Sequence, residues 1–221
     1  TLFKIMEWYF YLLIVLSFLI IVGIIVLFIL LHKYAKDIFR HKVWKKLYKL
    51  AQNYDYFLLN DVNLRIESNE NIHIDHLLIG DKFVYVIATR LYEDNIEANK
   101  LYDSKWNIVA SNRTFIKAVT NPVIVNEKRT VMLQSFLGCS KKGEMFKSIV
   151  VVNDNIDLKF GTSTTSKGSY LLKKKEVYKT IKRIEKESDL NPFDEEQLQK
   201  VVNRIHIMSE EQNKAASLFK K

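Results

Sequence analysis

The longest apolar run of the chain lies near its N-terminus. From Trp8 to Leu31 no side chain is charged, and the run is longer than the ~20 residues that a helix needs to span a bilayer. A secretory signal peptide would have a shorter apolar core, followed by small residues at a cleavage site, whereas His32 follows here. A buried core helix is a further alternative, but few soluble helices are apolar on every side. The pattern therefore predicts a transmembrane anchor in residues 1–35.

The charges on either side of this run predict its orientation. Lys4 and Glu7 are the charged residues before it, whereas a series of basic residues follows it against the single acid Asp37: Lys33, Lys36, Arg40, Lys42, Lys45, Lys46 and Lys49. By the positive-inside rule, the larger C-terminal part lies in the cytoplasm. The one cysteine, Cys139, offers no intrachain disulfide and suits that reducing compartment. We expect a single-pass protein of the cell membrane with a cytoplasmic C-terminal domain.

The segment after the apolar run, residues 36–55, has the spacing of an amphipathic helix. Apolar positions recur every three or four residues, at Val43, Trp44, Leu47, Leu50, Ala51 and Tyr54, and the lysines lie mostly on the other side. Such a basic face beside a membrane favours contact with anionic lipid headgroups, which attract each nearby cation by ~1 kcal/mol. Contact with nucleic acid is the alternative. We favour the headgroups for this segment because its charges begin directly after the span.

Beyond residue 55 the pattern changes from helical spacing to short β-type runs. Tyr56 to Ile66 reads as a strand, and Ile72 to Ile79 and Phe83 to Thr89 flank a turn signal at Gly80-Asp81, which predicts a β-hairpin. The second strand of this hairpin is apolar at nearly every position, as expected for a strand covered on both faces in the interior of an α/β sheet. The hairpin is the predicted centre of a domain in residues 56–190.

Further elements follow the hairpin. Leu91 to Asn112 is mixed and predicts a strand pair that carries Trp106 in the core. Asn121-Pro122 marks a helix start, since proline is tolerated in the first turn. The predicted apolar side of this helix consists of Val131, Met132, Phe136 and Leu137. Phe146 to Val152 predicts a second buried strand, which a crossover through the helix would connect to the hairpin.

The rest of the chain reads as support for this core. Residues 161–168 form a Thr/Ser/Gly connector without a phosphate-loop ending. A basic stretch between Lys173 and Lys186 predicts a helix with Val177, Ile181 and Ile184 inward. After a break at Asn191-Pro192, a C-terminal helix and tail are expected in residues 191–221. Asp194 would cap this helix with Gln197 in the first turn, and its apolar face would consist of Leu198, Val201, Val202 and Ile205.

One acid, Asp75, lies inside the first strand of the hairpin, where a buried carboxylate is costly unless a partner compensates it. Side chains alternate between the two faces of a strand. A two-residue loop would pair Asp75 with Val86, and a four-residue loop would pair it with Ala88. In both registers Asp75 shares a face with Ala88 and Arg90. By itself this arrangement is compatible with a buried ion pair between Asp75 and Arg90.

The hairpin resembles that of the NERD domain, the nuclease-related domain of the PD-(D/E)xK (restriction-endonuclease-like) superfamily. The family pattern, Ile-Asp-His followed by Val-Ile-Glu-Thr-Lys, is similar to Ile74-Asp75-His76 and to the stretch from Val86 to Arg90. Trp106 and Asn121-Pro122 fall where the family has a Trp and an Asn-Pro that opens a helix. The likeness covers Val43 to Leu137. It implies an α/β, restriction-endonuclease-like fold, with a mixed sheet flanked by helices.

The departures from the family pattern concern its catalytic residues. Ala88 stands where the family carries the Glu of Glu-x-Lys, and Arg90 stands where it carries the Lys. The Gly-Glu pair usual near the first helix is missing. The Gln and His of the later helix correspond to Val125 and Arg129. Of the catalytic set that the resemblance implies, Asp75 alone remains.

The chemistry of the family explains why these changes matter. Such nucleases hold Mg²⁺ with a few carboxylates, and the ion polarises the phosphoryl group and lowers the pKa of the attacking water. Asp75 alone is a weak ligand set, since Mg²⁺ requires octahedral oxygen coordination, and the methyl group of Ala88 coordinates nothing. Arg90 can stabilise phosphate charge but cannot act as a base. A displaced acid could complete the site, although no spacing favours one of the nearby residues Glu67, Glu70 and Glu93. We expect no cofactor, or Mg²⁺ if the domain is active.

Composition supports an anionic partner without identifying it. The chain of 221 residues carries a net charge of +9 and has a pI near 9.4. Its basic residues gather in two stretches, which form the candidate surface for nucleic acid or membrane: Lys42, Lys45, Lys46, Lys49, Lys174, Lys175, Lys182 and Arg183. We expect a membrane-anchored, catalytically impaired NERD-like protein that binds DNA or RNA through this surface. An active Mg²⁺- or Mn²⁺-dependent nuclease that uses Asp75 is one alternative, and a membrane-bound scaffold for a protein partner is the other.

Overall fold

The computed structural model describes residues 2–66, 70–110, 112–139, 144–162 and 168–194, together with positions 196, 198–199, 201–203, 205 and 207. The chain divides into two compact units, Thr1–Ile38 and Phe39–Lys221. Helix α1 (Leu2–Tyr54) begins in the first unit and ends in the second. The predicted juxtamembrane helix is therefore the last part of this longer helix.

The first unit consists of apolar helix. Its described side chains between Leu13 and Leu31 are exposed, and that of Phe28 has 73% of its surface accessible. Among the described residues, one helix is long and apolar enough to cross a membrane, judged by its length and composition. Exposure of so many apolar side chains is typical of a helix whose surroundings are lipid rather than water.

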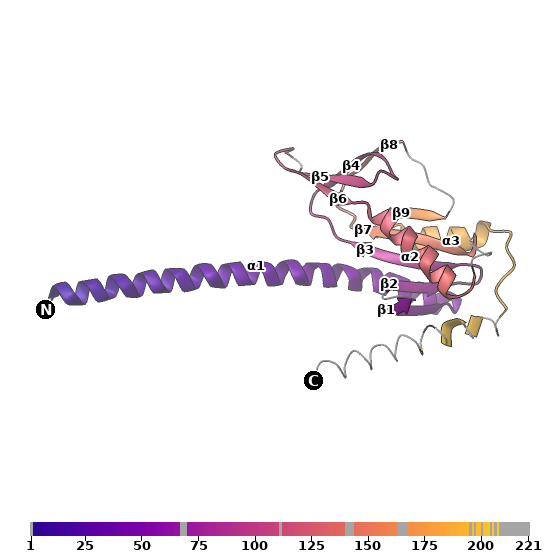
Figure 1. Cartoon of the computed structure of the whole chain (residues 1–221), viewed down its shortest axis with the longest axis horizontal. Helices are drawn as coiled ribbons and strands as arrows, with labels where there is room; N and C mark the ends of the chain where they lie inside the picture. The colour runs from indigo at the N-terminus through magenta and orange to yellow at the C-terminus, as the bar shows by residue number, and fades with distance from the viewer. Residues whose placement is uncertain are drawn as a thin grey trace. The chain divides into compact units, whose positions relative to one another are not determined.

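The second unit is built on a mixed five-stranded sheet (Figure 1). Its strands are β1 (Phe57–Ile66), β2 (Glu70–Ile79), β3 (Val84–Arg90), β7 (Phe146–Val152) and β9 (Ser169–Lys173), in the order β1-β2-β3-β7-β9. Strands β1, β2 and β3 are antiparallel, whereas β3, β7 and β9 run parallel. The predicted hairpin and the predicted second buried strand are thus neighbours at the centre of the sheet.

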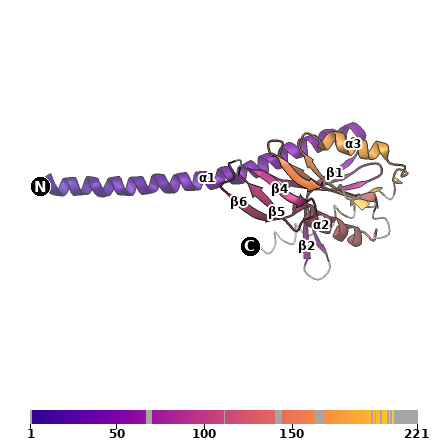
Figure 2. The same cartoon turned by 90° about the horizontal axis from the view of Figure 1, so that it is seen from above.

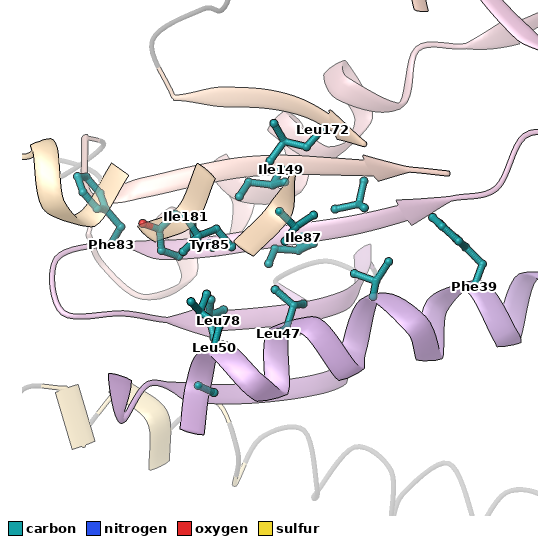
Figure 3. Packing of buried hydrophobic residues seen from close by; sticks show 14 residues of the cluster. Phe39, Leu47, Leu50, Leu78, Phe83, Tyr85, Ile87, Ile149, Leu172 and Ile181 are labelled. Atoms are coloured by element: carbon teal, nitrogen blue, oxygen red, sulfur yellow. The ribbon is translucent and has the colours of Figure 1, made fainter. Parts of the chain in front are cut away.

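The last turns of α1 and helix α3 (Val177–Glu187) cover one face of this sheet. Leu47 and Leu50 of α1 pack with Ile181 of α3 against Tyr85 and Ile149 of the central strands, and all five side chains are fully buried (Figure 3). Of the inward positions predicted for the helix in residues 36–55, Val43, Leu47, Leu50 and Ala51 are buried, and Trp44 and Tyr54 are partly buried.

Helix α2 (Pro122–Phe136) covers the opposite face. The side chain of Asn121 caps it by accepting a hydrogen bond from the Val123 N–H at 2.8 Å, at the predicted helix start. Asn126 ties the helix to the sheet, because its side-chain amide donates to the Val86 carbonyl at 2.8 Å. The expectation that Val131 lies on the apolar side was wrong, since Val131 is 53% exposed. The buried side includes Asn126 and the polar Thr130, so an apolar pattern alone misplaces it.

A second, four-stranded sheet follows β3 in the chain (Figure 2). It consists of β4 (Asn95–Lys100), β5 (Lys105–Val109), β6 (Ile116–Thr120) and β8 (Leu158–Thr162), in the order β6-β5-β4-β8. Trp106 is fully buried beneath it and its indole N–H donates to the Leu101 carbonyl at 3.3 Å, as expected for a core residue. The sequence predicted one strand pair here, and β6 and β8 extend that pair to a sheet.

The α/β class with mixed sheets flanked by helices is confirmed, with corrections towards the C-terminus. Strand β9 ends at Lys173, so the basic stretch begins in a strand and becomes helical at Val177. The first two residues of the expected connector, 161 and 162, belong to strand β8. Residues 163–167 lie outside the described part of the chain. Gln197, predicted in the first turn of the C-terminal helix, and most positions after 203 also lie outside the described part of the chain. Val202 and Ile205 are buried, as predicted.

Candidate functional site

The candidate site lies where β2 and β3 separate. The two strands pair from Ile79 opposite Val84 to His76 opposite Ile87. This register corresponds to the longer of the two predicted loops and places Asp75 across from Ala88, just beyond the last pair. From there β2 continues with β1 alone, while β3 continues with β7. We call this point the fork site: Asp75 with the side chains that contact it (His73, Arg40 and Arg90), the Arg40 partner Asp61, and Arg129, which interacts with it through charge.

Both oxygens of Asp75 are engaged. Its Oδ2 accepts hydrogen bonds from the Thr89 N–H at 2.7 Å and from the Thr89 hydroxyl at 3.0 Å. The Arg90 guanidinium reaches the same oxygen at 3.4 Å. The other oxygen, Oδ1, lies 3.3 Å from His73 Nε2 and 4.0 Å from Arg40. The side chain of Asp75 is 8% exposed, so its carboxylate oxygens contact protein groups rather than water.

These partners hold Asp75 in its charged form. Burial raises the pKa of the Asp75 carboxyl, but the hydrogen bonds from His73 and Thr89 and the charge of Arg90 lower it further than burial raises it. The pKa therefore lies well below its usual range. Such a shift stabilises the folded state through the charge of Asp75.

Arg40 enters the fork site from α1 and links two acids. Its guanidinium contacts the Asp61 carboxylate of β1 and lies 4.0 Å from Asp75 and 3.5 Å from His73 Nε2. Asp61 has a left-handed backbone, with φ of 53°, at the position of β1 that faces Asp75 across the β1–β2 register. Neither Arg40 nor Asp61 could be identified from the sequence, because both reach Asp75 only through the packing of α1 and β1 against β2.

Arg129 of α2 interacts with the site through its charge. One of its terminal nitrogens, Nη1, is buried and has no hydrogen-bond partner among the residues that the structure describes. Burial lowers the pKa of Arg129, the charge of Arg90 lowers it further, and the charge of Asp75 raises it. Arg129, which occupies a helix position where the family pattern has another polar residue, therefore belongs to the same electrostatic cluster as Asp75 and Arg90.

The donor set of the fork site does not fit Mg²⁺. The ion requires several oxygen ligands, with carboxylates among them, whereas the residue opposite Asp75 is Ala88, which is buried and offers a methyl group. The guanidinium groups of Arg40 and Arg90 flank the buried Asp75 carboxylate, and the second acid of the site, Asp61, is paired with Arg40. No cluster of three or more His, Cys, Asp or Glu side chains that could hold a metal is found in the described part of the chain. Glu67 and the side chain of Glu70 lie outside that part.

The two basic stretches come together on the face of the first sheet that α1 and α3 cover. Lys182 lies with its Nζ 5.6 Å from the centre of the Tyr54 ring, which joins α3 to the end of α1. Asp154 forms an ion pair with Lys174 at 3.1 Å, and the charge of Lys46 also acts on it. The remaining members of the predicted basic surface are exposed: Lys42, Lys45, Lys49, Lys175 and Arg183.

The exposed lysines of α1 and Arg40, the residue of α1 in the fork site, lie on different sides of the helix. With about 3.6 residues per turn, Lys42, Lys45 and Lys49 lie on the side of α1 away from Arg40. Arg40 turns towards β1 and β2 instead. The domain thus has two separate basic features, an exposed lysine stripe (Lys42, Lys45 and Lys49) and the arginine-lined fork.

A second buried acid, Glu185 of α3, lies near the turn of the hairpin. It accepts hydrogen bonds from the Tyr85 hydroxyl at 3.0 Å and from the Lys82 N–H at 3.1 Å. Burial raises the pKa of Glu185 to about 7, against the opposing effect of these two donors. Both donors belong to the turn end of the hairpin rather than to the fork site, so we assign Glu185 to the packing of α3.

Comparison with known proteins adds one clear finding. The sequence model of the nuclease-related domain, NERD, matches residues 36–153. No curated protein matches the chain. One solved structure with some likeness is the crystal structure of a protein of unknown function, with 12% sequence identity, 74% of this chain and 78% of that chain covered, and a TM-score of 0.32. At that TM-score the likeness assigns neither a fold family nor a function.

Proposed function

Since the chain belongs to the nuclease-related domain (NERD) family, we propose that it is a membrane-anchored protein whose domain binds nucleic acid without cutting it. One observation carries this proposal. The carboxylate that the family motif retains, Asp75, is occupied by Thr89, His73, Arg40 and Arg90, and its neighbour across the fork is Ala88.

Loss of cutting follows from the chemistry of hydrolysis. A PD-(D/E)xK-type site needs metal-bound water and oxygen ligands that hold the metal against the scissile phosphate. In the fork site, arginine side chains provide positive charge where the family supplies carboxylates and a metal ion. A guanidinium stabilises phosphate charge but remains protonated, so it cannot activate water. The site keeps affinity for phosphate and loses the means to cleave.

Binding is supported by the charge of the domain. Exposed lysines on α1 and basic residues before and within α3 lie over one face of the first sheet, and the arginines of the fork add a second basic feature. Phosphate contacts of this kind release counterions and give affinity without sequence specificity. The chain therefore suits DNA or RNA bound through its backbone.

The N-terminal helix supports a location at the membrane. Its apolar length suffices to cross a bilayer, and the basic residues that follow favour a cytoplasmic domain. In this arrangement the lysine stripe lies close to anionic headgroups. The nucleic acid would then be held at the inner face of the cell membrane.

The test uses the full chain in neutral detergent, with supercoiled plasmid and a salt series. The proposal predicts retention of DNA in EDTA that falls steeply as salt rises, and no cleavage in Mg²⁺ or Mn²⁺. Cleavage that disappears in Asp75→Ala would instead show an active nuclease, whereas cleavage that persists in this variant indicates contamination. Absence of retention for both DNA and RNA at low salt would favour the protein scaffold.

A further inference from the structure

We propose that the fork site binds a single phosphate group directly, through the guanidinium groups of Arg129 and Arg90, with no metal ion between protein and phosphate. The inference rests on the proposed function and deepens it, because it assigns one phosphate of the nucleic-acid strand to named side chains.

Arg129 is the first reason. Its buried Nη1 finds no hydrogen-bond partner within the described part of the chain, and a buried donor without an acceptor is destabilising, the more so when it carries charge. Side chains with this property are retained where a ligand supplies the missing acceptor. Asn126, three residues earlier on the same side of α2, donates to the Val86 carbonyl of β3 at 2.8 Å, and the charges of Arg90 and Asp75 act on Arg129. The acceptor would therefore be an anion held at the fork.

Arg90 is the second reason. Its Nη1 donates to the Thr89 carbonyl at 2.6 Å and lies 3.4 Å from Asp75, which fixes the plane of the guanidinium. The side chain is nevertheless 32% exposed. A fixed, partly exposed guanidinium is preorganised for two parallel hydrogen bonds to phosphate oxygens.

The charges of the fork site favour an anion over a cation. Arg40 and Arg90 contact the carboxylates of Asp61 and Asp75. Arg129, on which the charges of Arg90 and Asp75 act, adds a third guanidinium and leaves one net positive charge on the five groups. Asp75 is the deeper group, with 8% of its side chain exposed against 27% for Arg40 and 32% for Arg90. On the Arg90 side an anion from solvent therefore meets guanidinium before the Asp75 carboxylate, whereas the Asp61 carboxylate, 63% exposed, is already paired with Arg40. One phosphodiester, with its single negative charge, matches this excess.

Nucleic acid, free phosphate and lipid headgroups all present the same phosphate oxygens. The lysine stripe of α1 points away from Arg40, so its contribution can be separated from that of the fork by mutation. The decisive variant is Arg129→Met, which keeps the length of the side chain and removes its charge. Arg129→Lys retains the charge without the planar guanidinium group. Lys128→Gln, the matched control, removes a neighbouring exposed charge on the same helix.

The measurement is fluorescence anisotropy of a short labelled DNA strand with the full chain in neutral detergent and EDTA. We expect Arg129→Met to weaken binding about tenfold, the effect of removing one charge-assisted hydrogen-bonding group, Arg129→Lys to weaken it less, and Lys128→Gln to leave it nearly unchanged. The Tm of Arg129→Met should equal or exceed that of the parent chain, because the variant removes a buried donor that lacks a partner. A structural arginine would instead show a lower Tm on removal.

Three further arms separate the sources of phosphate and the two levels of the proposal. If the parent chain and Arg129→Met bind the strand equally, the fork inference is wrong and the proposed nucleic-acid binding stands. Binding that requires Mg²⁺ has the same two consequences. If the parent chain binds no strand, the proposed function fails. In that case the fork inference is tested by the Tm of the chain in inorganic phosphate or glycerol 3-phosphate, compared with its Tm in chloride at matched ionic strength. A rise in Tm that is seen for the parent chain and not for Arg129→Met supports a phosphate site. Equal Tm values in phosphate and in chloride overturn it.

Discussion

Arg90 Nη1 lies 3.4 Å from Asp75 Oδ2, across the point where β2 and β3 separate. Asp75 and Arg90 lie where the sequence resembles the Asp and the Lys of the NERD hairpin motif. The side chain of Asp75 is buried and that of Arg90 is partly exposed, so the pair presents a guanidinium to solvent. With Ala88 in place of the family Glu and Arg90 in place of the family Lys, we propose that the site holds an anion rather than a metal ion.

The first prediction concerns Asp75. Asp75→Asn removes the negative charge that Arg40, Arg90 and His73 surround, so we expect it to lower the free energy of unfolding by about 3 kcal/mol. The same change raises the net positive charge of the fork and should strengthen binding of a DNA strand. Denaturant unfolding and anisotropy measure the two effects on one sample. Asp157→Asn, an exposed acid elsewhere, is the control; weaker DNA binding by Asp75→Asn would contradict the anion site.

The second prediction concerns pH and Glu185. Because the folded-state pKa is about 7 against 4.5 for the free group, the folded protein binds a proton more tightly than the unfolded chain. Stability from this group is fully present below about pH 4.5 and falls as pH rises to about 7, by about 3 kcal/mol. We expect Glu185→Gln to abolish this fall and to be the more stable form at pH 8.

Unfolding midpoints measured across this pH range check the Glu185 prediction, with Glu187→Gln as the control because that acid is exposed on the same helix. Asp75 contributes in the opposite direction, since its pKa is lowered. Its stabilisation is present above about pH 4 and is lost as the pH falls through its folded-state pKa. A flat pH profile between 4.5 and 7 in the parent chain would refute the assignment of Glu185.

A third prediction restores the family motif. Ala88→Glu together with Arg90→Lys returns a carboxylate to the position across from Asp75 and replaces the guanidinium beside it. We expect this double variant to bind Mn²⁺ more tightly than the parent chain, because two carboxylates can then share the ion. Isothermal titration calorimetry measures the gain. No gain would mean that the geometry of the pocket has changed together with its side chains.

A fourth prediction concerns the lysine stripe. Replacing Lys42, Lys45 and Lys49 by Gln should weaken DNA binding and reduce the slope of log affinity against log salt, by up to ~0.9 for each phosphate that the variant no longer neutralises. Replacing Lys105, Lys117 and Lys128, which are exposed on other elements, is the matched control. If the two triple variants behave alike, total charge rather than a surface on α1 accounts for binding.

The centre of the fork could be predicted from the sequence for a physical reason. Strand alternation restricts which side chains share a face, so Asp75 and Arg90 could be placed together from the hairpin alone. Arg40, Asp61 and Arg129 could not, because they belong to three other elements and meet Asp75 only through tertiary packing. Arg129 was visible as a departure from the family pattern, but its electrostatic interaction with Arg90 was not.

The fold shows the same limit. Strands β3 and β7 are buried on both faces and are recognisable in the sequence as apolar runs. In contrast, Ile116 to Thr120 is mostly exposed in β6, so it lacks the burial pattern that marks a strand. Strand β9 is five residues long and runs into a lysine-rich stretch, which reads as the start of a helix. Val131 shows that an apolar side chain does not by itself define the buried face of α2, because Asn126 and Thr130 are buried there.

The central claim, that Asp75 serves an anion site rather than a metal site, is tested most directly by electron paramagnetic resonance of Mn²⁺. The ion is titrated into the full chain in detergent, with and without a short DNA strand, and the signal of free Mn²⁺ is compared between the parent chain and Asp75→Asn. We predict that the two titrations coincide. Stoichiometric uptake of Mn²⁺ by the parent chain that Asp75→Asn abolishes would contradict the account.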